Sequence, residues 1–163
     1  MKMKYFDKSI EKKVTLFRLI KDNTNPIDFR FGNLKHMRKK TKDIIKKNNI
    51  RLYCMKNIQG HIGAFCSTKS KEIVISELVL KDDVDILESI ILHEIGHILC
   101  PDETCHTEID KYVVKSGLGA ALYNGLKIYV YANGHLMKDE PSVIYRRRKI
   151  KEIIKEYEKE GFV

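Results

Sequence analysis

Two histidines and a glutamate form the pattern His93-Glu94-Ile95-Gly96-His97 near the middle of the sequence. Side chains four residues apart on a helix project from one face, one turn apart, so both imidazoles can reach a single metal ion at ~2.0–2.1 Å. Glu94 then lies beside the metal, where a carboxylate takes a proton from a metal-activated water and passes it to a leaving amine. The pattern predicts a catalytic Zn²⁺ site with His93 and His97 as metal ligands and Glu94 as general base.

A catalytic zinc site needs a third protein ligand and an open position for water. Downstream of the motif the sequence offers Glu103, His106 and Glu108. On a helix over 104–116, His106 and Asp110 share a face, whereas Glu108 lies about 200° round the helix from His106. A buried aspartate that accepts a hydrogen bond from a ligating imidazole fixes its tautomer. We expect His106 as third ligand and Asp110 as the partner of a ligating imidazole, with Glu108 as the alternative third ligand.

The motif lies within a segment that predicts a helix over 84–99. Apolar residues recur there at helical spacing, Asp82 and Asp83 suit its start, and Pro101 follows its end. Gly117 is placed to end the next helix. Other segments with helical periodicity or charge patterning predict helices over 5–21, 34–48, 104–116, 118–130 and 142–160, with a strand over 127–131 as an alternative.

Alternating apolar residues predict three short strands upstream of the motif, at 50–55, 61–66 and 72–76. The polar stretch Ser67–Ser70 suits a hairpin turn, so an antiparallel meander is the simplest arrangement. The expected fold class is α+β and zincin-like: a small antiparallel sheet packed on the helix that carries the motif, with flanking helices.

A chain of 163 residues with 43% hydrophobic content fits one domain. Its expected parts are a basic helical N-terminal part over 1–49, a catalytic core over 50–135 and a C-terminal helix over 142–160. Charges interrupt the first residues, and no apolar run approaches the ~20 residues that cross a bilayer. We expect a cytoplasmic protein without a membrane partner, whose four cysteines are reduced thiols: Cys54, Cys66, Cys100 and Cys105.

The net charge of +9 is unevenly distributed. Residues 1–56 carry 17 basic against 5 acidic side chains, while residues 57–143 carry 7 against 13. The basic ends could bind nucleic acid or an acidic partner. Charge runs are more often solvated helix faces, so a protein or peptide substrate is the main expected partner and nucleic acid the secondary one.

His93-Glu-Ile-Gly-His97, followed by Glu108-Ile-Asp110-Lys-Tyr, resembles the gluzincin-type zinc peptidases. The layout is similar to that of the ImmA/IrrE-like peptidases of phages, mobile elements and bacteria, over about residues 50–116. In that clan the third ligand is typically a glutamate four residues before an aspartate, and the matching position here is His106. The helix-turn-helix module of the family is not evident.

The resemblance implies a zincin fold, proteolysis as the activity, Glu94 as general base and a source among phages, viruses or bacteria. It also implies a strand that lines the cleft and binds substrate as an added strand, which would be Lys71–Ser76. A transition-state donor would come from one of four side chains: Tyr123, Tyr129, Tyr131 or His135.

Two other functions stay open on the sequence. His-Glu-x-x-His also serves deformylase-type hydrolysis of non-peptide amides, although no Glu-Gly-Cys motif occurs near Cys54 or Cys66. The other alternative is a non-catalytic module in which zinc stabilises a small fold and the basic ends bind nucleic acid or a protein partner.

Overall fold

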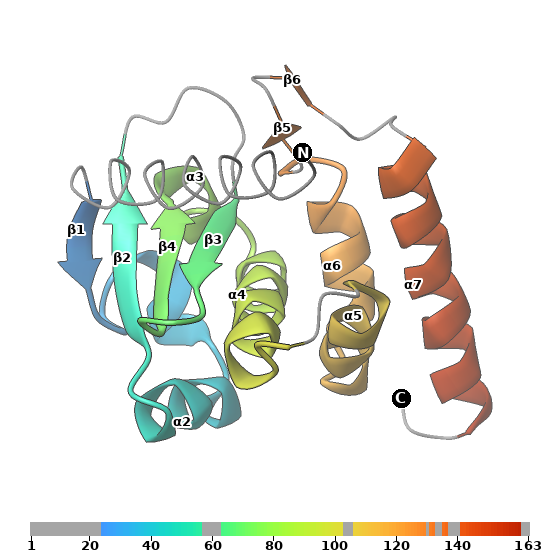
Figure 1. Ribbon diagram of the computed structural model, residues 1–163, viewed down its shortest axis with the longest axis horizontal. Helices are drawn as coiled ribbons and strands as arrows, with labels where there is room; N and C mark the ends of the chain where they lie inside the picture. Colours follow the sequence, from blue (N-terminus) through green and yellow to red (C-terminus); the bar gives the residue numbers. More distant parts are fainter. Residues whose placement is uncertain are drawn as a thin grey trace, which may run out of the picture.

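A mixed sheet and a set of helices make up the part of the chain that the computed structural model describes (Figure 1). The fold is α+β, as the sequence predicts. The described residues are 24–56, 63–102, 106–129, 131–132, 135–136 and 141–160, and the side chains of 131–132 and 135–136 are outside the description. The helix predicted over 5–21 also lies outside it. No helix among the described residues is long and apolar enough to cross a membrane.

The four-stranded sheet has the strand order β1-β2-β4-β3 (Figure 1). The three predicted strands are confirmed, with the bounds β2 Arg51–Met55, β3 Ala64–Ser67 and β4 Glu72–Ser76. Strands β3 and β4 form the predicted antiparallel hairpin. The predicted antiparallel meander is wrong at its other pairing, because β2 and β4 run parallel, with Arg51 opposite Glu72.

Strand β4 lies inside the sheet because its side chains are covered on both faces. All five of its residues are buried, which is typical of an interior strand with a parallel neighbour. Strand β3 therefore takes the edge of the sheet and contacts the motif helix. The expectation that Lys71–Ser76 forms the cleft-edge strand is wrong for the same reason, and β3 has that position.

Strand β1, Thr24–Ile27, was not predicted, because Asn25-Pro26 favours a chain break. The strand lies at the other edge of the sheet and pairs antiparallel with β2, so that Thr24 faces Met55. Proline lacks the N–H that an interior strand needs, but an edge strand tolerates it.

Most of the helices lie on one side of the sheet, where α4 to α7 follow one another, and α2 lies below the sheet in this view (Figure 1). The remaining elements are η1 Gly32–His36, α2 Lys39–Lys47, α3 Glu77–Leu80, α4 Val84–Leu99, α5 His106–Lys115, α6 Gly119–Gly125, β5 Tyr131–Ala132, β6 His135–Leu136 and α7 Pro141–Lys159.

Several helix predictions are confirmed and one is wrong, and the helix predicted over 118–130 ends at Gly125, with turns and a bend over 126–129. Helix α4 has the predicted bounds, and its N-terminus is capped by Asp83, whose carboxylate accepts from the backbone N–H of Asp85 at 2.9 Å. Gly117 has a φ of +81°, as expected for the residue that ends α5. The single helix predicted over 34–48 is instead divided into η1 and α2. Extended backbone at Arg38 separates the two, and its side chain reaches the buried Glu88 on α4 at 3.0 Å.

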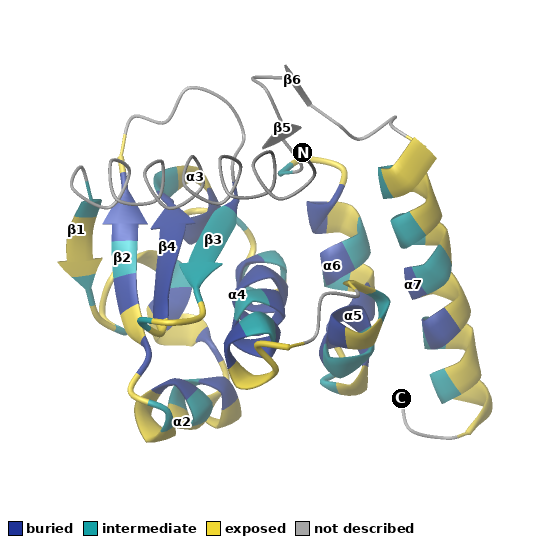
Figure 2. Ribbon diagram, viewed as in Figure 1, coloured by how far each residue is buried: buried dark blue, intermediate teal, exposed yellow. Residues whose placement is uncertain are grey.

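Helix α4 is the central element of the fold. It lies between the sheet on one side and α5 and α6 on the other, and α7 covers α5 and α6 from outside (Figure 1). Ten of its 16 residues are buried, on more than one face, which is why its sequence is apolar almost all round (Figure 2). The motif residues are thus held on a helix that is packed from both sides.

Gly96, inside the motif, allows α5 to approach α4 closely. A Cβ atom built on Gly96 would lie 2.8 Å from Cγ2 of Ile109 on α5, closer than carbon atoms pack. Because Ile109 is followed directly by Asp110 and lies one turn after His106, this crossing sets how near α5 side chains come to the motif.

Replacement of Gly96 by alanine is therefore expected to push α5 away from α4. We expect the free energy of unfolding to fall by about 1–3 kcal/mol, the usual cost of overpacking, and zinc affinity to fall with it. Chemical denaturation and zinc titration measure the two effects. Ile109→Ala in the Gly96→Ala background should restore part of the zinc affinity. Gly125→Ala is the control, because its Cβ would meet side chains at 3.5 Å or more. An unchanged zinc affinity in Gly96→Ala would contradict the argument.

Candidate metal centre

Three histidines come together where α4 and α5 cross. His93 and His97 lie one turn apart on α4, and His106 is the first residue of α5. One ring nitrogen from each lies within 4.8 Å of the others. The Nε2 atoms of His93 and His97 are 3.0 Å apart. The structure thus brings together the three residues predicted as ligands, in a group that can hold a metal ion.

Among the described residues the donor set consists of three nitrogens, the number of protein ligands in a tetrahedral catalytic zinc site. At metal–nitrogen distances of ~2.0–2.1 Å, tetrahedral geometry places ligand nitrogens about 3.3 Å apart, close to the 3.0 Å between His93 and His97. The nitrogen of His106 lies within 4.8 Å of the other two, and its side chain is exposed. Imidazole ligands suit zinc and also copper, iron and nickel.

Burial favours the neutral form of all three imidazoles, which is the form that binds metal. Burial lowers the pKa of His93 to about 4, and the nearby Arg146 charge acts in the same direction. Burial likewise lowers the pKa of His97 and of His106 below the usual range.

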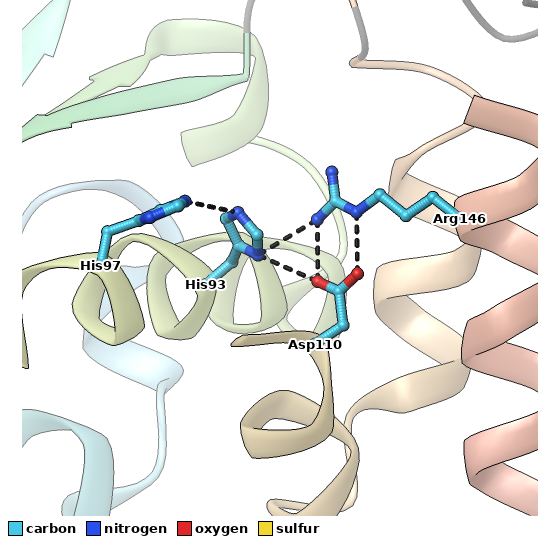
Figure 3. Close-up of polar contacts among 4 residues, drawn as sticks. All are labelled: His93, His97, Asp110 and Arg146. Carbon is cyan, nitrogen blue, oxygen red and sulfur yellow. Dashed lines mark hydrogen bonds and ion pairs between the residues drawn. The ribbon is translucent and has the colours of Figure 1, made fainter. Parts of the chain in front are cut away.

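Behind His93 lies a buried ionic network drawn from three helices (Figure 3). Nδ1 of His93 is 3.0 Å from Oδ1 of Asp110, whose side chain is 1% exposed. Arg146, on α7, donates to both oxygens of Asp110, each at 2.8 Å. Burial acts to raise the pKa of Asp110, but hydrogen bonds from Arg146 and His93 outweigh it and hold the pKa below its ordinary value. Asp110 is thus an anion that accepts from Nδ1–H and leaves Nε2 of His93 free for a metal.

Glu94 points into the same cavity as the histidines. Burial raises the pKa of its carboxyl to about 7, although a hydrogen bond with the Cys66 thiol on β3 and the charge of Arg146 act to lower it. A carboxyl with a pKa near neutrality can both accept and return a proton at the pH of a cell. The geometry places it beside the three histidines, as the motif predicts.

Glu108, the alternative third ligand, lies elsewhere. Its side chain is 53% exposed, forms an ion pair with Lys111 at 3.1 Å, and borders a separate pocket beside Leu99 and Tyr112. The 200° separation on the helix explains this placement. Glu103, the other carboxylate considered, lies outside the described residues.

The cavity beside the histidines has a volume of about 250 Å³. Apart from the polar groups named above, its wall consists of backbone and apolar side chains from β3, α4, α6 and the segment after α6: Gly63, Ala64, Ile90, Leu122, Gly125, Leu126 and Tyr129. A mostly apolar cavity with a few convergent polar groups is the usual form of a small-molecule or substrate site.

The predicted transition-state donors are only partly described. Tyr129 borders the cavity, but its hydroxyl donates a hydrogen bond to Asp82. Tyr123 does not line the cavity, and the ammonium groups of Lys127 and Lys151 lie over its ring. The side chains of Tyr131 and His135 are outside the description. Tyr129 is therefore the one member of this set that the structure places at the cavity.

Two residues of the site were not predicted. Arg146 lies in the segment predicted as the C-terminal helix, and nothing local in the sequence links it to His93, 53 residues away. Cys66 was assigned as an ordinary thiol. The strand alternation that places Ala64 and Cys66 on one face is the signal that could have directed attention to it, once β3 is known to border α4.

The chain was compared with protein-family models, curated proteins and solved structures, and none matches. The resemblance to ImmA/IrrE-like peptidases therefore remains a prediction based on the motif and the helix that follows it.

Proposed function

We propose that this protein is a zinc-dependent metallopeptidase. The observation that carries the proposal is that Glu94 shares one cavity with the three-histidine group, next to His93 in sequence and on the same helix. A purely structural zinc site fills all four positions with protein ligands and needs no carboxylate beside it. Among the described residues, the group that can bind a metal has three members, which leaves one position for water or substrate.

A zinc ion held by His93, His97 and His106 would polarise a substrate carbonyl and lower the pKa of a bound water towards ~7. Side chains of the protein would carry out the proton transfer and orient the ligands. Glu94 takes the proton of the attacking water on its carboxylate and later delivers it to the leaving amine. Asp110 keeps Nδ1 of His93 protonated, so that the ring presents the correct nitrogen.

Strand β3 offers the surface on which an extended peptide would lie. It pairs with β4 along one side, and no described strand pairs with its other side. Ala64 on this strand and Gly63 just before it line the histidine cavity. A peptide added along this edge would form backbone hydrogen bonds and carry its scissile bond past the histidines.

The zinc-loaded protein is expected to cleave unfolded protein or a mixed peptide library, because the site combines a metal group with a general base. New termini detected by mass spectrometry measure the cleavage. Chelation should abolish it, added Zn²⁺ should restore it, and circular dichroism should show that the chelated protein keeps its fold.

The same experiment distinguishes the competing function. If chelation unfolds the protein and no peptide is cut under any loading, the metal is structural and the non-catalytic module is the better description. Cleavage of N-formyl or other non-peptide amides without cleavage of peptides would instead favour the deformylase-type reaction.

A further inference from the structure

Helix α7 reaches the histidine cavity through Arg146. The rest of its inner face packs against α5 and α6 through apolar contacts, with Ile150 and Ile153 buried (Figure 2). Of the described α7 residues, Arg146 alone lines the cavity, and its side chain is 20% exposed. The charged group of a C-terminal helix thus lies against a site built by α4 and α5.

Arg146 donates hydrogen bonds to both oxygens of one carboxylate, that of Asp110. Nε bonds Oδ2 of Asp110 and Nη2 bonds Oδ1, each at 2.8 Å, while Nη2 also lies 3.1 Å from Nδ1 of His93 (Figure 3). This two-point geometry fixes the plane of the carboxylate, which a single-point donor such as lysine does not do.

We propose that Arg146 is a positioning residue that joins α7 to the metal centre, so that docking of α7 and binding of metal stabilise each other. Arg146 orients Asp110, Asp110 orients His93, and His93 presents Nε2 to the metal. This inference rests on the metal site of the proposed function, although not on peptidase activity. Coupling of this kind is reciprocal: whatever metal binding does for α7, docked α7 does for metal binding.

The positive charge of Arg146 by itself disfavours metal binding, because it lies near the position that a divalent cation would occupy. Asp110 accepts bonds from both Arg146 and His93, so its carboxylate charge offsets much of that repulsion. The remaining contribution of Arg146 to metal binding is the orientation of the Asp110 carboxylate. An unclamped buried Asp110 could rotate away from Nδ1 of His93, and loss of an outer hydrogen bond of this kind typically weakens metal affinity by about 10–100-fold.

The test compares full-length variants by zinc competition with a chromophoric chelator. Arg146→Ala is expected to weaken zinc binding by about tenfold, and Arg146→Lys should not restore it. Methylguanidine should partly restore binding in Arg146→Ala, whereas methylamine should not. Arg148→Ala removes the same charge from an exposed position on the same helix and should match the wild type.

Two readouts report positioning directly. In the zinc-loaded wild type, nuclear magnetic resonance should show a slowly exchanging Nδ1–H proton on His93, and zinc should slow amide hydrogen exchange in α7. Both signatures should be lost in Arg146→Ala and kept in Arg148→Ala. If Arg146→Ala does not fold, Arg146→Gln serves in its place, because it keeps a polar side chain but is shorter, uncharged and without the guanidinium that bonds both oxygens of Asp110.

Unchanged zinc affinity and an unchanged Nδ1–H signal in Arg146→Ala would overturn the inference. So would full recovery in Arg146→Lys, because charge alone would then suffice. Zinc that binds the wild type but leaves exchange in α7 unaltered would overturn the coupling and leave the proposed function intact. A wild-type protein that binds no transition metal would overturn both.

Discussion

Replacement of His106 by alanine is expected to remove zinc from the protein at neutral pH. His106 supplies one of the three nitrogens of the group, and with two histidines left the site no longer holds a metal against water. The affinity should fall by more than the ~100-fold typical of changes behind a ligand. Elemental analysis after dialysis, and zinc competition with a chelator, measure the loss.

Two other variants on α5 serve as controls for this result. Glu108→Ala should keep near-normal zinc affinity, because its side chain is half exposed and pairs with Lys111 away from the cavity. Asp110→Ala should retain zinc with an affinity reduced by about 10–100-fold, since it removes the partner of His93 and no ligand. Loss of zinc in Glu108→Ala together with its retention in His106→Ala would show that the third ligand is the carboxylate.

Replacement of Glu94 by glutamine is expected to abolish peptide hydrolysis while zinc stays bound. The amide has nearly the shape of the carboxyl group but cannot take a proton from water, and general-base contributions are worth about 10²–10⁴-fold in rate. The comparison is made at equal zinc content, by mass spectrometry of the cleaved peptides and by elemental analysis.

The Cys66 thiol gives a useful control for this variant, because it bonds the same carboxyl group. Cys66→Ser keeps a donor to Glu94, so it should retain most of the activity that Glu94→Gln loses. Hydrolysis that persists in Glu94→Gln at full zinc occupancy would mean that another group is the base.

The local parts of the site could be predicted from the sequence because they depend on one helix at a time. The bounds of α4 follow from its capping Asp83 and its apolar periodicity, and those local signals outweigh any tertiary effect on this helix. The expectation that His106 rather than Glu108 joins the histidine group depends likewise on the angle between the two positions round α5. The structure places the two side chains on different sides of this helix.

The order of strands and the role of α7 could not be predicted in this way. Sequence neighbours often pair, and this tendency favoured the meander, whereas the complete burial of β4 required it to lie between β2 and β3. That burial is visible in the sequence only as a strand without alternation, Ile73-Val74-Ile75. Arg146 reaches Asp110 only after α7 packs on α5, and a contact of this range has no local signature.

The three histidines come together where α4 and α5 cross, so a metal ion held there would link metal supply to the lifetime of the protein. In an unfolded chain His106 is separated from the motif by an unstructured segment, so the three nitrogens do not converge and metal binds mainly to the native state. At a free metal concentration a hundred times its dissociation constant, such preferential binding adds about 2.7 kcal/mol to the free energy of unfolding. A loaded molecule would therefore open less often to proteases than an unloaded one, and a cell that withholds metal would shorten the survival of this protein as well as remove the proposed activity.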